Sequence, residues 1–194
     1  MTMPYDAVSE LSDEALLVLY AKGDPLAAQV LSRRFLPRVL AHATRVLKDQ
    51  AEAEDVAQEA MLRLWKIAPD WRAGEAQVTT WMYRVTANLC TDRIRKRRSV
   101  PLDSAPEPED DTPSAGEAMQ DAARAQALNA ALMELPDRQR QAVALRHLEG
   151  LSNPEIAEIL DCGVEAVESL IARGKRALTK ILQGKREELG YVDE

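Results

Sequence analysis

A proline-rich, acidic segment in the middle of the sequence constrains the fold more than any other feature. Residues 99–121 contain four of the ten prolines, and residues 99–124 contain seven acidic side chains and one basic side chain. Large apolar side chains are scarce there, so the segment cannot bury enough surface to offset the entropy lost on ordering. We therefore predict a flexible acidic linker over residues 99–124, between one domain at residues 1–98 and a second at residues 125–194.

The two flanking segments carry the apolar spacing of α-helices. Apolar residues recur every three or four positions, and the period-two alternation of strands is nowhere convincing. Aromatic residues make up only 4% of the chain, which also favours helices over sheets. We predict an all-α protein made of two small helical domains, which the linker leaves loosely coupled. The expected helices are one capped by Ser12, one that starts at Asp24-Pro25, one over about 52–67, one around 81–89, and four over 125–134, 138–148, 153–161 and 165–182.

Charge and cysteine content exclude several classes of function. The net charge is −7, whereas a free-standing DNA-binding protein is usually basic. The two cysteines, Cys90 and Cys162, lack neighbours with metal-ligand spacing, so we expect no metal site and a reducing compartment. No catalytic constellation or phosphate-binding loop is apparent, so we expect no enzymatic activity and no cofactor. Without a secretory signal or an apolar run of about 18 residues, we expect a cytoplasmic protein that does not bind membranes.

Residues 151–182 have the pattern of a helix-turn-helix. Ser152 and Glu155 can form a capping box, and Gly163 lies in a short turn before a second helix. In a helix-turn-helix the exposed face of the second helix enters the major groove. A plain helical hairpin with a solvated face is the alternative, but the basic residues that follow favour DNA. The candidate residues of this face are Ser169, Arg173, Lys175 and Arg176.

Residues 71–98 combine aromatic, amide and basic side chains. One polar face of the expected helix holds Arg84, Asn88, Thr91 and Arg95, and it continues into Lys96, Arg97 and Arg98. Cations of this kind bind phosphates, and aromatic rings can stack on unpaired bases. We expect Trp65 and Trp81 in the core and predict a base contact for Trp71, which lies in a loop.

A third polar face lies on the helix expected at 52–67. Asp55, Gln58, Glu59 and Leu62 recur at i, i+3, i+4 and i+7. Spacing alone indicates no more than a solvated surface for these residues.

Three stretches, in this order along the chain, resemble bacterial RNA polymerase sigma factors of the extracytoplasmic-function group, the sigma-E-like type. They are DQAEAEDVAQEAMLRLWK (49–66), TTWMYRVTANLCTDRIRKRR (79–98) and LPDRQRQAVALRHLEGLSNPEIAEILDCGVEAVESLIARGKRAL (135–178). The resemblance implies that the first domain (sigma region 2) binds the clamp helices of the β′ subunit of core RNA polymerase, and recognises and melts the minus-ten promoter element. It implies that the second domain (region 4) reads the minus-thirty-five element.

The resemblance also implies roles for individual residues. Asp55, Gln58 and Glu59 match positions that contact β′, and we add Leu62 from the same face. Asn88 matches a position that captures an unstacked minus-ten base, and Trp71 lies in the specificity loop before it. Ser169, Arg173 and Arg176 match the recognition helix of region 4. Glu168 and Leu170 depart from the basic residues that many members carry there.

The family resemblance further implies partners and explains the acidity of the chain. Sigma factors bind promoters together with core polymerase, which supplies much of the DNA affinity and which the chain would contact through the β′ clamp helices and the β subunit. Members are commonly held inactive by an anti-sigma factor, and some of these inhibitors bind zinc. Stress responses are the typical setting.

Two other functions are weighed against this one. A sigma-like decoy, which binds an anti-sigma factor but not DNA, should lack the basic stripes and usually carries a fused receiver domain. An ordinary helix-turn-helix repressor leaves the motifs at 49–98 without a role.

Overall fold

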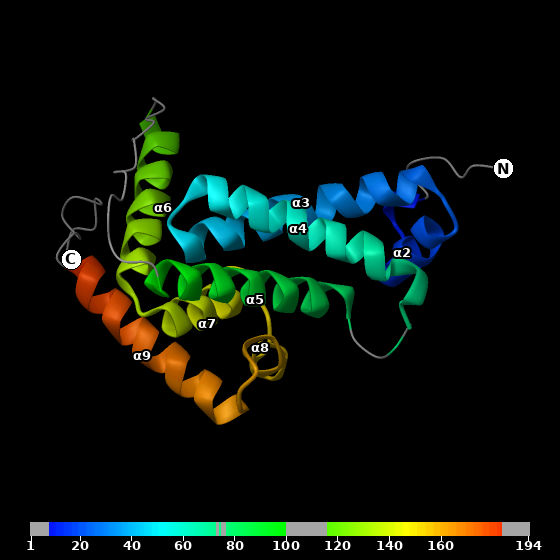
Figure 1. Cartoon of the computed structure of the whole chain (residues 1–194). Coiled ribbons are helices and arrows are strands. Elements are labelled where there is room, and N and C mark those ends of the chain that lie inside the picture. The colour runs from blue at the N-terminus through cyan, green and yellow to red at the C-terminus, as the bar shows by residue number, and fades with distance from the viewer. Residues whose placement is uncertain (1–7, 73, 75–76, 100–115, 184–194) are drawn as a thin grey trace.

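A computed structural model describes residues 8–72, 74, 77–99 and 116–183 of the chain. All regular elements within these residues are helices, which confirms the all-α prediction. Figure 1 shows α7, α8 and α9 of the second half below the helices of the first half, with α6 standing upright beside the ends of α3 and α4.

The first half is built from long helices whose starts follow the expected caps. The Ser12 hydroxyl accepts a hydrogen bond from the Ala15 amide at 3.2 Å, and the Asp24 carboxylate accepts one from the Leu26 amide at 2.9 Å. Each cap satisfies an amide that the first turn leaves unpaired. The elements are α2 (Asp13–Ala21), α3 (Pro25–Leu47), α4 (Gln50–Ile67), the 3₁₀ turn η1 (Ala68–Asp70) and α5 (Val78–Ser99).

Helices α3, α4 and α5 lie side by side along the length of the first half. Their apolar stripes meet in a core that includes Leu31, Phe35, Leu64 and Met82, none of which is more than 1% exposed. The polar faces of α4 and α5 are therefore turned outward, where they can meet partners.

The second half is a helical bundle that contains the predicted helix-turn-helix. Its elements are α6 (Gly116–Glu134), α7 (Asp137–His147), α8 (Asn153–Leu160) and α9 (Val164–Gln183). The Ser152–Glu155 capping box is formed at the start of α8. The residue with left-handed backbone after α8 is Asp161, with φ 49°, and not Gly163.

The predicted linker is wrong at both ends. Helix α5 runs through Ser99, and α6 begins at Gly116, inside the span 99–124 that the composition assigned to the linker. The sequence from Gly116 onward is rich in alanine, whose side chain offers little apolar surface but which has the highest helix propensity. Residues 100–115 lie outside the described residues.

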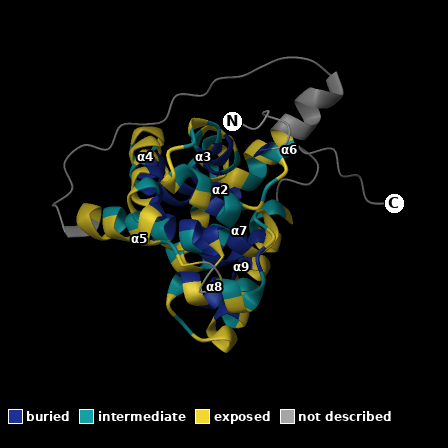
Figure 2. Ribbon diagram, turned by 90° about the vertical axis from the view of Figure 1, so that its right-hand side faces the viewer, coloured by how far each residue is buried: buried dark blue, intermediate teal, exposed yellow. Residues whose placement is uncertain are grey.

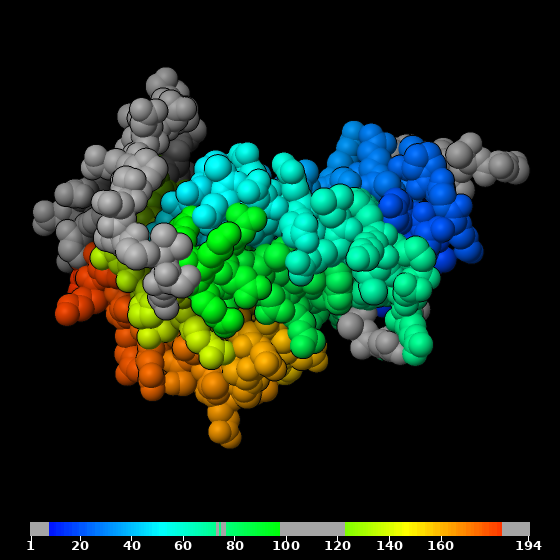
Figure 3. Space-filling model, in the orientation of Figure 1, coloured from blue at the N-terminus to red at the C-terminus, as the bar shows by residue number. Residues whose placement is uncertain are grey.

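The expectation that the two halves are loosely coupled is also wrong. Helix α5 packs on α8, and α3 packs on α6 and α7. Tyr83 and Ala87 of α5 belong to one buried apolar cluster with Leu145, Ile156 and Val167 of the second half. Buried residues of both halves meet around α7 and α8 (Figure 2), and in the space-filling view the second half lies directly against α5 (Figure 3).

Candidate polymerase and nucleic-acid interfaces

The outer face of α4 carries the first predicted site, and it is more apolar than its sequence indicated. Leu62 is 62% exposed, the highest fraction of any large apolar side chain among the described residues. Leu36 of α3, 40% exposed, lies next to it. The two leucines line a shallow groove together with Ser32, Gln58 and Met61.

The acidic residues of the α4 face lie on the same helix as the groove residues Gln58 and Leu62, and both are paired with arginines. Asp55 is exposed and forms an ion pair with Arg93 at 3.5 Å (Nη1 to Oδ2). Glu59 forms one with Arg63 at 2.8 Å (Nε to Oε1), one turn further along α4. An apolar groove with acidic side chains on the same helix is suited to a partner helix that has an apolar stripe and basic flanks. The sequence reasoning missed the contribution of Leu36, which lies beside the core position Phe35 in α3.

Five of the residues predicted to bind the minus-ten element are exposed along α5. They are Arg84, Asn88, Arg95, Lys96 and Arg97. This arrangement agrees with the single polar face that the spacing predicted, and it provides cations and an amide along about three turns of helix.

Arg97 has a structural role that the sequence reasoning did not foresee. Its guanidinium donates to the Leu47 carbonyl at 2.7 Å and forms ion pairs with Glu52 at 2.7 Å and Asp49 at 3.5 Å. It therefore caps the C-terminal end of α3 and links α5 to the α3–α4 turn. Arg98 is part of α5, but its side chain lies outside the described residues.

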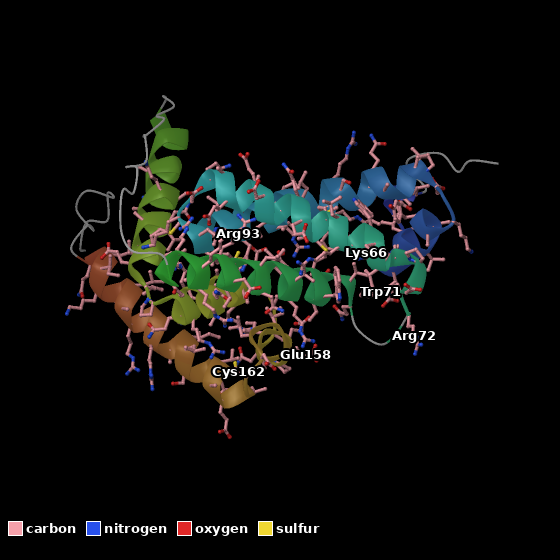
Figure 4. The ribbon with its side chains drawn as sticks, in the orientation of Figure 1. Lys66, Trp71, Arg72, Arg93, Glu158 and Cys162 are labelled. Atoms are coloured by element: carbon pink, nitrogen blue, oxygen red, sulfur yellow. The ribbon has the colours of Figure 1, made fainter. Side chains whose placement is uncertain are left out.

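Trp71 follows η1 and is held by another tryptophan. Its ring lies edge-to-face against Trp81, with 6.0 Å between centroids and an interplanar angle of 89°. The Trp71 indole nitrogen is buried and has no hydrogen-bond partner. In Figure 4, Trp71 and Arg72 lie at the end of the molecule where α5 begins. A base that stacks on Trp71 would contact an indole ring whose orientation is already fixed by Trp81.

The exposed face of α9 carries the third predicted site. Arg173, Lys175 and Arg176 are exposed, whereas Ser169 is half-buried. Lys175 and Arg176 also line a groove with residues from α7 and α8, namely Arg146, His147 and Asn153. This cationic groove widens the candidate DNA surface beyond the recognition helix.

Two polar groups in the α9 groove have properties that suit contact with DNA. Burial, with the charges of Lys175 and Arg146, lowers the pKa of His147 and so favours its neutral imidazole. The Asn153 side-chain oxygen is buried without a hydrogen-bond partner. Glu168, the residue that departs from the family pattern, lines the same groove.

A polar cluster joins the two halves, and the sequence reasoning missed it entirely. Glu149, in the turn after α7, has a carboxylate only 7% exposed. It forms an ion pair with Arg45 at 3.0 Å (Nη1 to Oε1) and accepts a hydrogen bond from the Tyr83 hydroxyl. His42 lies edge-on to the Tyr83 ring, at 5.6 Å between centroids. Burial, with the nearby charge of Arg45, lowers the pKa of His42 to about 4.

Within the described residues, no group of three or more His, Cys, Asp and Glu side chains could hold a metal ion. Burial raises the pKa of the Cys90 thiol to about 12, so this cysteine stays protonated. In the same part of the chain, no helix has the length and apolar character needed to cross a membrane.

Comparison with known families and proteins identifies the class of protein. Residues 31–100 match Sigma-70 region 2, and residues 125–178 match Sigma-70, region 4. The first match covers the α4 and α5 faces, and the second covers the helix-turn-helix.

Individual relatives narrow the class. The chain is 30% identical over 187 residues to the RNA polymerase sigma-H factor of Pseudomonas aeruginosa, covering 91% of this chain and 96% of that protein. It is 33% identical over 182 residues to the ECF RNA polymerase sigma factor SigE of Mycolicibacterium smegmatis, covering 89% and 70%. The chain belongs to the extracytoplasmic-function (ECF) family of RNA polymerase sigma factors, which are transcription initiation factors.

A solved structure agrees with this assignment. The structure of CnrH in complex with the cytosolic domain of CnrY matches with a TM-score of 0.64 and 25% identity, over 89% of this chain and 97% of CnrH.

Proposed function

We propose that the chain binds bacterial core RNA polymerase through the α3–α4 groove and directs it to promoters that are read by α5 and α9. The groove formed by Leu36, Gln58 and Leu62 is the observation that carries this proposal. Leu62, 62% exposed, and Leu36, 40% exposed, form one apolar patch along this groove, and an exposed apolar patch with polar neighbours is typical of a protein-binding surface. The β′ clamp helices are the partner that the family assignment supplies.

Each of the two DNA-binding surfaces would recognise a different promoter element: α5 the minus-ten element and α9 the minus-thirty-five element. Asn88 and Arg84, with the Trp71 ring at the start of α5, are suited to an unpaired minus-ten strand, because amide and aromatic groups recognise bases that have left the stack. Arg173 and Arg176 on α9 are suited to the major groove of the minus-thirty-five duplex, where an arginine can donate two hydrogen bonds to guanine. Lys175 and the neighbouring Arg146 would hold the phosphates.

We further propose that an anti-sigma factor controls the chain in the cytoplasm, as part of a stress response. A solved structure of similar fold, the sigma factor RpoE in complex with the anti-sigma factor NepR from Bartonella quintana, supports a partner of this kind. A second apolar groove, formed by α6, α7 and α9 and lined by Leu128, Leu132, Leu178 and Leu182, offers a surface to such an inhibitor or to the β subunit. The inhibitor, rather than this chain, would be the place for any zinc. The chain itself would carry no catalytic activity.

The proposal is tested by run-off transcription with bacterial core polymerase on a library of genomic promoters. We expect transcripts from a small set of promoters only when the chain is added. The variant Leu62→Asp should abolish them while retaining the helical circular dichroism of the parent. Absence of any chain-dependent transcript with active core polymerase would refute the proposal.

A further inference from the structure

We propose that Glu168 of α9 determines part of the base preference of the second half, by accepting a hydrogen bond from the exocyclic amino group of a cytosine in the minus-thirty-five element. Glu168 can act in this way only if α9 enters the major groove, so the inference rests on the proposed function. What it adds is the base, and the donor on that base, that one residue of this chain would select.

Glu168 belongs to a row of exposed residues on α9 that faces one groove. Glu168, Ala172 and Arg176 follow one another at intervals of four residues, and all three line the groove between α9 and the adjacent parts of α7 and α8. Residues at this interval lie above one another on a helix, about 6 Å apart at about 1.5 Å per residue. This spacing is a little less than two base-pair steps of B-DNA, at about 3.4 Å each. The row can therefore contact neighbouring base pairs when α9 lies in a major groove.

The charge of Glu168 is opposite to that of the other ionised groups in this groove. Arg146, Lys175 and Arg176 also line it, and Glu168 is the one carboxylate among the described residues that do so. The Glu168 side chain is exposed, and within the same described ranges its carboxylate takes part in no hydrogen bond and no ion pair. Its oxygens are therefore available to a ligand, while the three cations can bind phosphates on either side.

The chemistry of the major groove decides which base this carboxylate can contact. An ionised carboxylate only accepts hydrogen bonds. Guanine presents two acceptors in the major groove, and thymine presents an acceptor and a methyl group, so both repel a carboxylate. Adenine presents its N6 donor beside the N7 acceptor, whereas cytosine presents the N4 donor alone. Glu168 should therefore favour cytosine, tolerate adenine and reject guanine and thymine at one position of one strand.

A purely electrostatic role for Glu168 has a different signature. If the carboxylate only reduced the positive charge around Arg146 and Lys175, it would weaken phosphate binding equally on every sequence. Removal of the carboxylate would then strengthen DNA binding uniformly and would leave the base preferences unchanged. The base preference at a single position therefore separates the two roles, whereas overall affinity does not.

The first test uses the full chain with core RNA polymerase and a promoter library in which the minus-thirty-five element is randomised. A barcode in the transcribed part of each promoter is sequenced in the run-off transcripts. We expect a position at which the parent prefers cytosine on one strand and at which Glu168→Ala has lost this preference. Glu168→Gln should shift it to adenine, because a glutamine amide donates to N7 and accepts from N6.

The matched control is Glu158→Gln. It removes the same charge from an exposed position of α8 that does not line the α9 groove, so the base preferences should equal those of the parent. Circular dichroism should show the parent's helical signal in all of these variants, because neither glutamate is buried.

The second test removes only the donor on the base. N4-methylcytosine at the selected position still pairs with guanine, but it carries a methyl group in place of the N–H that points into the major groove. We expect ~10-fold weaker promoter binding by the parent with core polymerase, since hydrogen bonds to charged groups are of this strength. The loss with Glu168→Ala should be less than ~2-fold.

The outcomes separate this assignment from the proposed function. Identical base preferences in the parent, Glu168→Ala and Glu168→Gln would overturn the role of Glu168 and leave the proposed function intact. An equal loss on N4-methylcytosine for the parent and Glu168→Ala would have the same consequence. Absence of any transcript that depends on the parent chain, with active core polymerase, would overturn the proposed function and the role of Glu168 with it.

Discussion

The first half of the chain has two apolar surfaces, one at the α3–α4 groove and one around Tyr83, and they differ in whether another part of the chain covers them. The α3–α4 groove leaves Leu62 and Leu36 exposed, and no element of the described residues covers them. The opposite surface, around Tyr83, is covered by region 4, and Tyr83 is only 1% exposed. The first surface is open to solvent and can bind another molecule, whereas the second is buried against the second half of the chain.

This difference concerns which surface is accessible in the folded chain. The α3–α4 groove is lined by residues of α3 and α4 alone, although α6 and α7 also pack on α3. The buried residues of α5 around Tyr83 become accessible only if the second half moves away from α5.

The open surface should be the most sensitive to substitution. We expect Leu62→Asp to weaken binding to core polymerase by about 2 kcal/mol, or ~30-fold, because a central apolar side chain in an interface is typically a hot spot. The control is Glu54→Ala, an exposed position about two turns earlier on α4. Fluorescence anisotropy with labelled chain measures both. Equal affinity for Leu62→Asp and the parent would remove the groove from the polymerase interface.

Region 4 should show a loss of similar size at individual bases. If Arg173 or Arg176 donates two hydrogen bonds to a base edge, its change to alanine should cost about 1–3 kcal/mol and relax specificity at one position. Lys180→Ala, further along α9, should cause only a small and uniform loss. Electrophoretic mobility shifts with single-base variants of the minus-thirty-five element measure the pattern. A uniform loss for both arginines would indicate phosphate contacts alone.

The closed surface should respond to acid through His42. Its pKa is about 4 in the folded chain and about 6.5 when unfolded, so the unfolded chain binds the proton first as pH falls. The stability that neutral His42 contributes is complete above pH 6.5 and declines toward pH 4, by about 2 kcal/mol between pH 7 and 5. Urea unfolding should show that His42→Leu removes this part of the pH dependence. His147→Gln, at an exposed position, should remove much less, and an unchanged slope in His42→Leu would contradict the assignment.

The smallest effect is expected within region 4 itself. A Cβ at Gly174 would lie 2.5 Å from the Cγ2 atom of Val143, and the β-branched Val143 side chain has little freedom to move away. Gly174→Ala should therefore cost about 1 kcal/mol net, after the gain in helix propensity is included. At Gly163 a Cβ would meet nothing within 4 Å, so Gly163→Ala is the control. Thermal unfolding compares the two, and greater stability for Gly174→Ala would show that α7 and α9 can separate.

The sequence predicted those features that depend on local pattern. Apolar spacing and caps such as Ser12 and Asp24 located the helices, and the family motifs located the faces of α4, α5 and α9. The ion pairs of Arg97 could not be predicted, because its basic run gives no sign of acidic partners at the α3–α4 turn. Glu149 and Tyr83 are 66 residues apart, and nothing in either local sequence marks them as a pair. The composition of residues 99–124 indicated a linker and therefore loosely coupled halves. Whether the halves pack together depends on the apolar faces of α5, α7 and α8, which the linker composition does not report.

The most direct measurement of the contrast between the two surfaces compares Leu62→Asp with Tyr83→Ala, in urea unfolding and in binding to core polymerase. The account predicts that Leu62→Asp, at the open groove, keeps the stability of the parent and loses affinity for the polymerase. Tyr83→Ala should lose stability, because the Tyr83 ring is buried and its hydroxyl donates to Glu149. Equal stability of Tyr83→Ala and the parent, or equal polymerase affinity of Leu62→Asp and the parent, would contradict the account.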